Sequence, residues 1–198
     1  GTYKDLDYSY IVEDDFEAGY LATKHLLDLG HTKIGGIFKS DDIQGHYRYK
    51  GFREACSERG LKFQESRILW FDTERGDEKL GNKDNGQLDC LLRECSGLVC
   101  YNDQVAMKVL DRARYIGISI PRDVSLVSFD DSQLAVASEI KLTTVAHPQE
   151  KLGEEAAKAI LQMIGREKNY HAIKMKPRLV IRGSTQEFKE RKGDLVDG

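Results

Sequence analysis

Three short apolar segments of this sequence each run directly into acidic or amide side chains, a combination that could bind a ligand rich in hydroxyl groups. The polar residues are Asp41 and Asp42 after the first segment, Asn102 and Asp103 after the second, and Asp130 and Asp131 after the third. Carboxylate oxygens accept charge-assisted hydrogen bonds from hydroxyls, and an asparagine amide both donates and accepts. An acidic rim repels phosphate, and no glycine-rich phosphate loop follows any of the segments. The residue types therefore favour a neutral polyol, such as a sugar, over a nucleotide.

Arg48 and three aromatic residues could complete such a site. The guanidinium of Arg48 offers a planar fork of donors to two ligand oxygens, and Trp70, Phe71 or Tyr101 could cover the apolar face of a sugar ring. Each assignment has a structural alternative. Asp and Asn after a strand are also ordinary helix N-caps, Arg48 would equally suit a solvated surface, and Trp70 and Phe71 would equally suit the hydrophobic core.

The segments that must position these residues alternate between strand and helix patterns. Strands are predicted at residues 33–38, 68–71, 97–101, 124–129, 142–145 and 179–181. Helices are predicted after the N-cap pair Asp14-Asp15, at 46–59, around 88–92, at 105–113 and at 148–163. This alternation predicts an α/β fold with βαβ units on a parallel sheet. Ligands of such sheets bind beyond the carboxyl ends of the strands, where the acidic residues stand.

The composition is that of a globular protein and does not indicate strong binding of nucleic acid by this chain. Hydrophobic residues make up 40% of the 198 residues and charged residues 32%, and the formal net charge is −3. Lys and Arg form no basic stripe, so the chain alone is not expected to bind DNA strongly. No apolar run approaches the roughly 20 residues of a membrane helix, and the first residues lack the apolar region of a signal peptide. We therefore expect no membrane association.

The cysteines and histidines indicate neither a metal site nor a catalytic one. Cysteines stand at positions 56, 90, 95 and 100, a spacing that fits neither a zinc framework nor a disulfide layout and favours reduced thiols in the cytoplasm. His25 and His31 are too far apart for one helical metal face, and the sequence contains neither a Gly-x-Ser-x-Gly nor a His-Glu-x-x-His motif. A glycosidase with paired carboxylates stays a competing hypothesis. We expect a binding protein without catalytic residues, metal or cofactor.

Five segments, in order over about residues 13–185, resemble the lactose/galactose repressor family. The segments are 29–34 (LGHTKI), 101–106 (YNDQVA), 120–131 (IPRDVSLVSFDD), 142–145 (LTTV) with Gly153 and 156–157, and 182–185 (RGST). A narrower similarity, to the arabinose repressors of Gram-positive bacteria, lies in 38–45 with Arg48 and 51–52, in 129–135, and in 147–151. The resemblance implies a cytoplasmic repressor whose effector is L-arabinose. It also implies a homodimer that contacts operator DNA through a winged-helix domain absent from this chain.

The resemblance also implies a set of ligand-binding residues. Arg48, three residues before the pair at 51–52, matches the arginine that holds sugar hydroxyls, and Asn102 and Asp130 match two further contacts. Asp14 is the best match for the polar residue just before the first helix. The aromatic platform does not align cleanly, and Trp70 and Phe71 are its candidates.

The fold implied by the resemblance has two lobes, in the manner of type I periplasmic binding proteins, and is N-terminally truncated here. The predicted parts are a partial N-terminal lobe at 1–62, a C-terminal lobe at 63–140, a helix returning to the N-terminal lobe at 146–165, a final C-terminal-lobe segment at 170–185 and a tail at 186–198. Sugar in the cleft between the lobes would cause an allosteric change that releases DNA. An extracytoplasmic sugar-binding protein of a transporter is the alternative on the same fold.

Overall fold

The main body of the molecule is built on one six-stranded sheet with the order β3-β2-β4-β5-β6-β8. The computed structural model describes residues 10–62, 64–81, 86–147, 149–164 and 172–190. The strands are β2 (Ile34–Lys39), β3 (Ile68–Phe71), β4 (Gly97–Cys100), β5 (Ser125–Phe129), β6 (Thr143–Ala146) and β8 (Arg178–Val180). All neighbours from β3 to β6 are parallel, and β8 is antiparallel to β6. The α/β class with a parallel sheet is confirmed.

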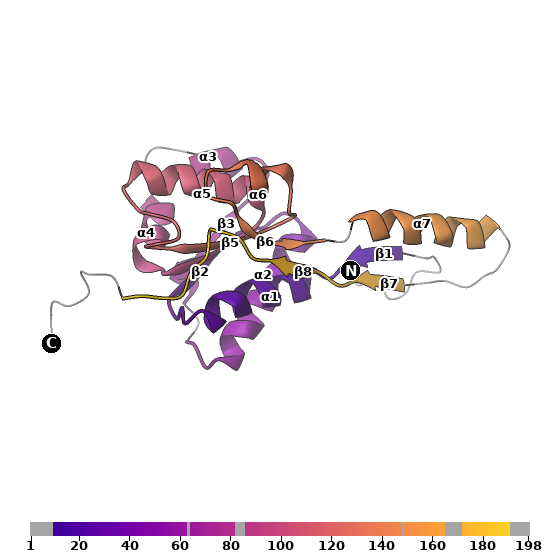
Figure 1. Cartoon of the computed structure of the whole chain (residues 1–198), viewed down its shortest axis with the longest axis horizontal. Helices are drawn as coiled ribbons and strands as arrows, with labels where there is room; N and C mark the ends of the chain where they lie inside the picture. Colours follow the sequence, from indigo (N-terminus) through magenta and orange to yellow (C-terminus); the bar gives the residue numbers. More distant parts are fainter. Residues whose placement is uncertain (1–9, 63, 82–85, 148, 165–171, 191–198) are drawn as a thin grey trace.

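Helices cover both faces of this sheet (Figure 1). One face packs against α1 (Asp15–Asp28) and α2 (Ile43–Glu58), and the other packs against α3 (Gly76–Gly81), α4 (Gly86–Glu94), α5 (Asp103–Tyr115) and α6 (Gln133–Ala137). Alternate residues of one strand enter opposite cores: Ile37 joins the α4–α5 side, and Phe38 joins the α1–α2 side. A short 3-10 helix, η2 (Glu65–Arg67), leads into β3.

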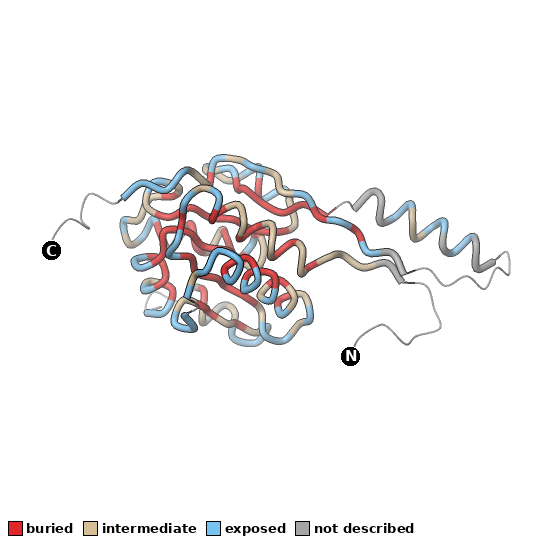
Figure 2. The backbone as a smooth tube through the Cα atoms, turned by 90° about the horizontal axis from the view of Figure 1, so that it is seen from below, coloured by how far each residue is buried: buried red, intermediate tan, exposed pale blue. Residues whose placement is uncertain are grey.

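A small second part projects from the carboxyl end of the sheet. It consists of β1 (Tyr10–Glu13), which pairs in parallel with β7 (Ala172–Met175), and α7 (Gln149–Ile164), which lies beside β1. Figure 1 shows these three elements as an arm beside the main body, and Figure 2 shows that buried backbone is concentrated in the main body. No helix among the described residues is long and apolar enough to cross a membrane.

The structure differs from the predicted domain boundaries in where the first 62 residues belong. The predicted partial lobe at 1–62 contains β2, yet β2 lies inside the six-stranded sheet between β3 and β4. Hydrophobic periodicity identifies a buried strand but not its neighbours, which explains the difference. The segment predicted at 170–185 divides between the two parts, because β7 pairs with β1 and β8 pairs with β6.

Two other predicted parts, the returning helix and the tail, can be located in the structure. Helix α7 occupies the predicted returning helix at 146–165 and lies against β1 rather than the main sheet. The described start of the predicted tail returns to the main body, where the Phe188 amide donates to the Leu29 carbonyl at 2.8 Å. Pro148, the predicted first residue of the α7 helix, and residues 191–198 of the tail lie outside the described residues.

Candidate ligand-binding site

A buried arginine organises the carboxyl edge of the six-stranded sheet. Arg48 is 2% exposed, and its Nε donates to Asp15 Oδ1 at 2.9 Å. Its Nη1 donates to the carbonyl of Tyr101 at 2.6 Å, and its Nη2 lies 3.6 Å from Asp130 Oδ1. The surface alternative for Arg48 is therefore excluded. The guanidinium joins the starts of α1 and α2 to the ends of β4 and β5.

Two glycines allow the helix that carries Arg48 to approach α1 closely. A Cβ on Gly19 would lie 2.0 Å from the Arg48 carbonyl oxygen, and a Cβ on Gly51 would lie 2.0 Å from the Phe16 carbonyl oxygen. Since such distances are impossible for non-bonded atoms, only glycine permits this contact of the two helix backbones. The contact places Arg48 beside Asp15 at the first turn of α1.

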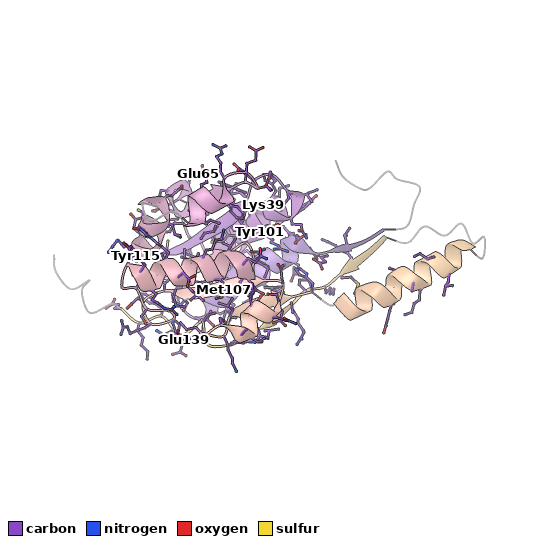
Figure 3. The ribbon with its side chains drawn as sticks, turned by 90° about the horizontal axis from the view of Figure 1, so that it is seen from above. Lys39, Glu65, Tyr101, Met107, Tyr115 and Glu139 are labelled. Atoms are coloured by element: carbon purple, nitrogen blue, oxygen red, sulfur yellow. The ribbon has the colours of Figure 1, made fainter. Side chains whose placement is uncertain are left out.

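Aromatic rings flank the guanidinium. Its central carbon lies 4.5 Å from the centroid of the Phe129 ring and 5.2 Å from that of Tyr101, within the range of cation–π attraction. The Tyr101 hydroxyl donates to Asp42 Oδ2, which fixes its ring. Tyr101 and Lys39, at the ends of neighbouring strands, are labelled in Figure 3. These contacts hold Arg48 in one orientation before any ligand is present.

Glu13 and His147 stand beside Arg48 where the chain crosses between the main body and the arm. Arg48 Nη2 lies 3.4 Å from His147 Nε2, and His147 Nδ1 lies 3.3 Å from Glu13 Oε2. A guanidinium can only donate, so Nε2 is the acceptor nitrogen and Nδ1 carries the proton. Burial, with a contribution from the Arg48 cation, lowers the pKa of His147 to about 4. The imidazole is therefore neutral at physiological pH.

The carboxylates around Arg48 are withdrawn from water to different degrees. Burial raises the pKa of Glu13, Asp15 and Asp130, and the Arg48 cation opposes the shift in each case. Asp130 differs from the others because its side chain is still 40% exposed. Its backbone adopts φ 98°, a conformation that is uncommon outside glycine and is often found at binding sites. Asp130 is thus the carboxylate of this group that is accessible to a ligand hydroxyl.

Asp103 holds the turn that carries Asp130. It is 1% exposed, and its carboxylate accepts hydrogen bonds from Ser128 Oγ, Thr144 Oγ1, Ser132 N and Ser132 Oγ. These donors belong to β5, to β6 and to the segment between Asp131 and α6. All acceptor capacity of Asp103 is used within the protein, so its role is to fix the geometry of this edge.

Three of the predicted polar residues act as helix N-caps. Asp14 Oδ1 accepts from Glu17 N at 3.0 Å, Asp42 Oδ1 accepts from Gly45 N at 2.7 Å, and Asn102 Oδ1 accepts from Val105 N at 2.9 Å. Asp14 Oδ2 also pairs with Lys174 Nζ on β7 at 2.7 Å. The predicted N-cap alternative therefore holds at these positions. Ligand contacts by Asp14 and Asn102 stay predictions.

The two aromatic candidates lie on opposite faces of β3. The Trp70 ring packs against Tyr49 and His46, with centroids 5.0 and 5.4 Å away. Phe71 is 7% exposed within the α4–α5 core, where it packs edge-on against Tyr101 at 5.6 Å. Both residues therefore belong to packed aromatic groups, and a stacking role for either stays a prediction.

The site also contains residues that the sequence did not single out. Asp15, which was noted only as part of an N-cap pair, is the direct partner of Arg48, while Glu13 and His147 were not proposed as site residues. Asp15 is the first residue of the helix that Asp14 caps, so its position in the sequence could have indicated that it lies at the same edge. Glu13 and His147 reach the site only through the pairing of β1 and the crossing after β6.

A resident metal ion does not fit the arrangement around Arg48. Ligand atoms of Glu13, Asp15 and His147 lie within 4.8 Å of one another, a spacing that could suit a cation. The Arg48 guanidinium, however, already donates to Asp15 and lies beside His147. It supplies the positive charge that the carboxylates need, and it would repel a metal.

The family model that matches the chain is that of the periplasmic binding protein-like domain, over residues 23–185. The arabinose metabolism transcriptional repressor of Halalkalibacterium halodurans is 42% identical over 96% of this chain and 52% of its own length. The repressor of the same description from Geobacillus stearothermophilus is 38% identical over 88% of this chain and 49% of its own length. The chain thus spans about half the length of the curated relatives it matches.

Among solved structures, a LacI family transcriptional regulator from Enterococcus faecium with bound ribose superposes with a TM-score of 0.78 at 27% identity. That likeness covers 93% of this chain and 68% of the neighbour. This chain therefore shares its overall fold with the matched part of that neighbour. The match of the family model to most of the chain shows that it belongs to the family of periplasmic binding protein-like domains.

Proposed function

We propose that this chain is the effector-binding part of a transcriptional repressor and that a small sugar, L-arabinose, binds at the carboxyl edge of the sheet around Arg48. The observation that carries the proposal is the pair formed by Arg48 and Asp130. One is a buried, oriented donor and the other is a half-exposed acceptor, and their closest atoms are 3.6 Å apart.

The Arg48–Asp130 pair has hydrogen-bonding capacity left for a hydroxyl. An arginine has five N–H groups, and Asp15 and the Tyr101 carbonyl use one from Nε and one from Nη1. The Nη2 contacts with Asp130 and His147, at 3.6 and 3.4 Å, are longer than well-formed hydrogen bonds. A sugar hydroxyl that accepts from Nη2 and donates to Asp130 would satisfy both groups with charge-assisted bonds.

Further contacts would come from residues around this pair. The Asn102 amide nitrogen would donate to an additional hydroxyl, and Asp14, whose Oδ2 is paired with Lys174, would contact one beside that pair. Trp70 or Phe71 is proposed as the aromatic cover of the ring. The neutral His147 would offer a ring nitrogen instead of a charge, which suits an uncharged ligand. We propose binding without catalysis, because the buried carboxylate of Asp15 is paired with Arg48 rather than free to transfer a proton.

The choice of a pentose rests on relatives. Two curated relatives are described as repressors of arabinose metabolism, and the solved neighbour from Enterococcus faecium holds ribose, which is also a pentose. Those descriptions concern regulators, so they favour a cytoplasmic repressor over an extracytoplasmic binding protein of a transporter.

The position of the site suggests how binding would act on DNA. Glu13 and His147 lie on two of the three connections between the main body and the β1–β7–α7 arm. A sugar bound beside them would favour one arrangement of the two parts by as much as its affinity differs between arrangements. We propose that this shift passes through a homodimer to DNA-binding domains outside this chain and releases operator DNA.

Calorimetric titration with L-arabinose, D-ribose and D-galactose at millimolar concentration tests the proposal. We expect saturable binding of L-arabinose that is at least tenfold weaker in Asp130→Asn and in Arg48→Lys, since each loses a charge-assisted bond. Glu139→Gln, at an exposed position that follows α6, is the matched control and should bind as the parent does. Saturation by another sugar alone would overturn the choice of L-arabinose, and no saturation by any sugar would overturn the sensor function.

A further inference from the structure

A second charged region lies at the amino ends of β3, β2 and β4, opposite the edge that holds Arg48. A pocket of ≈ 430 Å³ opens there, and its lining includes Lys33, Arg67, Arg93, Glu94, Ser96 and Phe188. Lys33, Arg67 and Ser96 each stand directly before a strand, and those strands are neighbours in the sheet. Figure 1 shows the chain after β8 running to this end of the main body, away from the arm.

The pocket is cationic although the whole chain is acidic. Lys33, Arg67 and Arg93 face a single carboxylate, Glu94, whereas the formal net charge of the chain is −3. Glu94 itself accepts a hydrogen bond from Cys90 Sγ at 3.0 Å. By formal charge the lining therefore carries more cations than carboxylates.

Arg67 has a buried donor without a partner. Its Nε is shielded from solvent and makes no hydrogen bond with the described residues. An unsatisfied buried donor on a cation is costly, because its hydration is lost without replacement. This residue contrasts with Arg48, whose Nε is bonded to a carboxylate. An anion in the pocket would instead offset the charge of this guanidinium, whose Nε has no acceptor among the described residues.

One wall of the pocket is fixed by a buried histidine. His31 Nε2 lies 3.0 Å from the Gln186 carbonyl and must donate to it, so His31 Nδ1 accepts from Ser96 Oγ at 3.0 Å. The Phe188 ring packs edge-on against His31 at 5.6 Å and is still 39% exposed. The wall therefore presents an ordered aromatic ring next to the cations.

We infer that this pocket binds the phosphoryl group of a small molecule. Guanidinium groups match phosphate oxygens through their planar fork, and a lysine adds a point charge. The exposed ring of Phe188 would contact an organic part of the ligand, such as a nucleobase. The ligand class is thus a phosphate or phosphate ester, in contrast to the neutral sugar proposed for the carboxyl edge.

Titration of the chain with inorganic phosphate and, separately, with adenosine monophosphate, in a buffer free of phosphate and at low salt, tests this inference. We expect saturable binding that weakens about tenfold in Lys33→Gln and in Arg67→Gln. Lys50→Gln, which removes an exposed lysine of α2, is the matched control and should leave the affinity unchanged. Tighter binding of the ester than of free phosphate would identify the organic phosphate as the ligand source, and equal affinities would identify free phosphate.

Two results would overturn the inference. One is the absence of saturable binding of both anions, and the other is equal weakening by Lys50→Gln, which would mean diffuse attraction to any surface cation. If Arg67→Gln does not fold, Lys33→Gln decides, because Lys33 is exposed. L-arabinose is not used in this titration, so its outcome is independent of the sugar-binding proposal.

Discussion

At the carboxyl edge of the six-stranded sheet, Arg48 is buried and its Nε is bonded to Asp15, whereas at the amino edge Arg67 Nε is buried with no partner among the described residues. The same residue type thus has opposite surroundings at the two ends of neighbouring strands. Where the protein supplies the counter-charge, the arginine is oriented in advance and suits a neutral ligand. Where the Nε of the arginine is not bonded to a carboxylate of the described residues, the arginine suits an anion.

Two carboxylates at the carboxyl edge also differ in how far the protein satisfies them. Asp103 accepts hydrogen bonds from Ser128, Ser132 and Thr144, while the side chain of Asp130 is 40% exposed next to Arg48. A saturated carboxylate stabilises the fold, and an unsaturated one is available to a ligand. Substitutions should therefore separate stability from binding along this edge.

The largest effect is expected for Asp103→Ala. The substitution leaves the buried hydroxyls of Ser128 and Thr144 without their acceptor, so we expect a loss of about 3–5 kcal/mol in the free energy of unfolding. Urea denaturation followed by circular dichroism measures it. Asp111→Ala, at an exposed position of the same helix, should change stability by less than about 0.5 kcal/mol. Equal losses in the two variants would refute the buried role of Asp103.

Gly19→Ala should lower the free energy of unfolding slightly less than Asp103→Ala does. Its Cβ would collide with the Arg48 carbonyl oxygen, so α1 and α2 must separate, and we expect a loss of about 2–3 kcal/mol. The matched control is Gly153→Ala in α7, where a Cβ meets no atom within 4 Å and helix propensity favours alanine. Thermal unfolding of the two variants should shift in opposite directions, and a neutral Gly19→Ala would contradict the close crossing.

His147 makes the stability depend on pH. Its pKa falls from 6.5 in the unfolded chain to about 4 in the folded protein. As the pH falls through this range, the unfolded chain takes up a proton that the folded protein does not bind. The stability that His147 contributes is therefore fully present above pH 6.5 and is lost as the pH falls to about 4. Between pH 7 and pH 4.5, the free energy of unfolding of the parent should fall relative to that of His147→Gln by on the order of 2 kcal/mol. The raised pKa values of Glu13, Asp15 and Asp130 act with the opposite sign and are common to both proteins. A difference independent of pH would mean that His147 is not buried in the neutral form.

The smallest effect on stability is expected for Asp130→Asn. Because burial raises the pKa of Asp130, its charge disfavours the folded state at neutral pH, and the neutral isostere should raise the free energy of unfolding. Solvent screens this 40% exposed side chain, so we expect a gain well below about 1 kcal/mol. The same variant should lose sugar affinity, as described above. Loss of both stability and binding would place Asp130 among the structural carboxylates, beside Asp103.

The α/β class and most elements of the main body followed from hydrophobic periodicity and helix caps, because these signals are local. Asp14, Asp42 and Asn102 cap helices as their positions before apolar periodic segments allow. The lobe boundary did not follow, since the pairing of β2 with β3 and β4 depends on tertiary packing. Strands β1 and β7 were not anticipated either, because each is short and is defined by the other.

The same reason explains which site residues were foreseen. Arg48 and Asp130 were proposed from motifs that can be read along the chain, and the structure brings them within 3.6 Å of each other, while ligand contact by either stays a prediction. Glu13 and His147 come from distant segments and meet only where the chain crosses between the main body and the arm. The contrast between Asp103 and Asp130 was also invisible in sequence, because it depends on which hydroxyls each carboxylate meets.

Heteronuclear NMR of the 15N-labelled chain, titrated first with L-arabinose and then with inorganic phosphate, tests the assignment of the two edges most directly, since it detects millimolar affinities residue by residue. The account predicts that the sugar shifts the amide signals of residues 13–15, 102, 130 and 147, together with the Nε–H signal of Arg48. It predicts that phosphate shifts those of residues 33, 67, 93 and 96. Sugar-dependent shifts at the amino edge, or none at the carboxyl edge at saturating sugar, would contradict it.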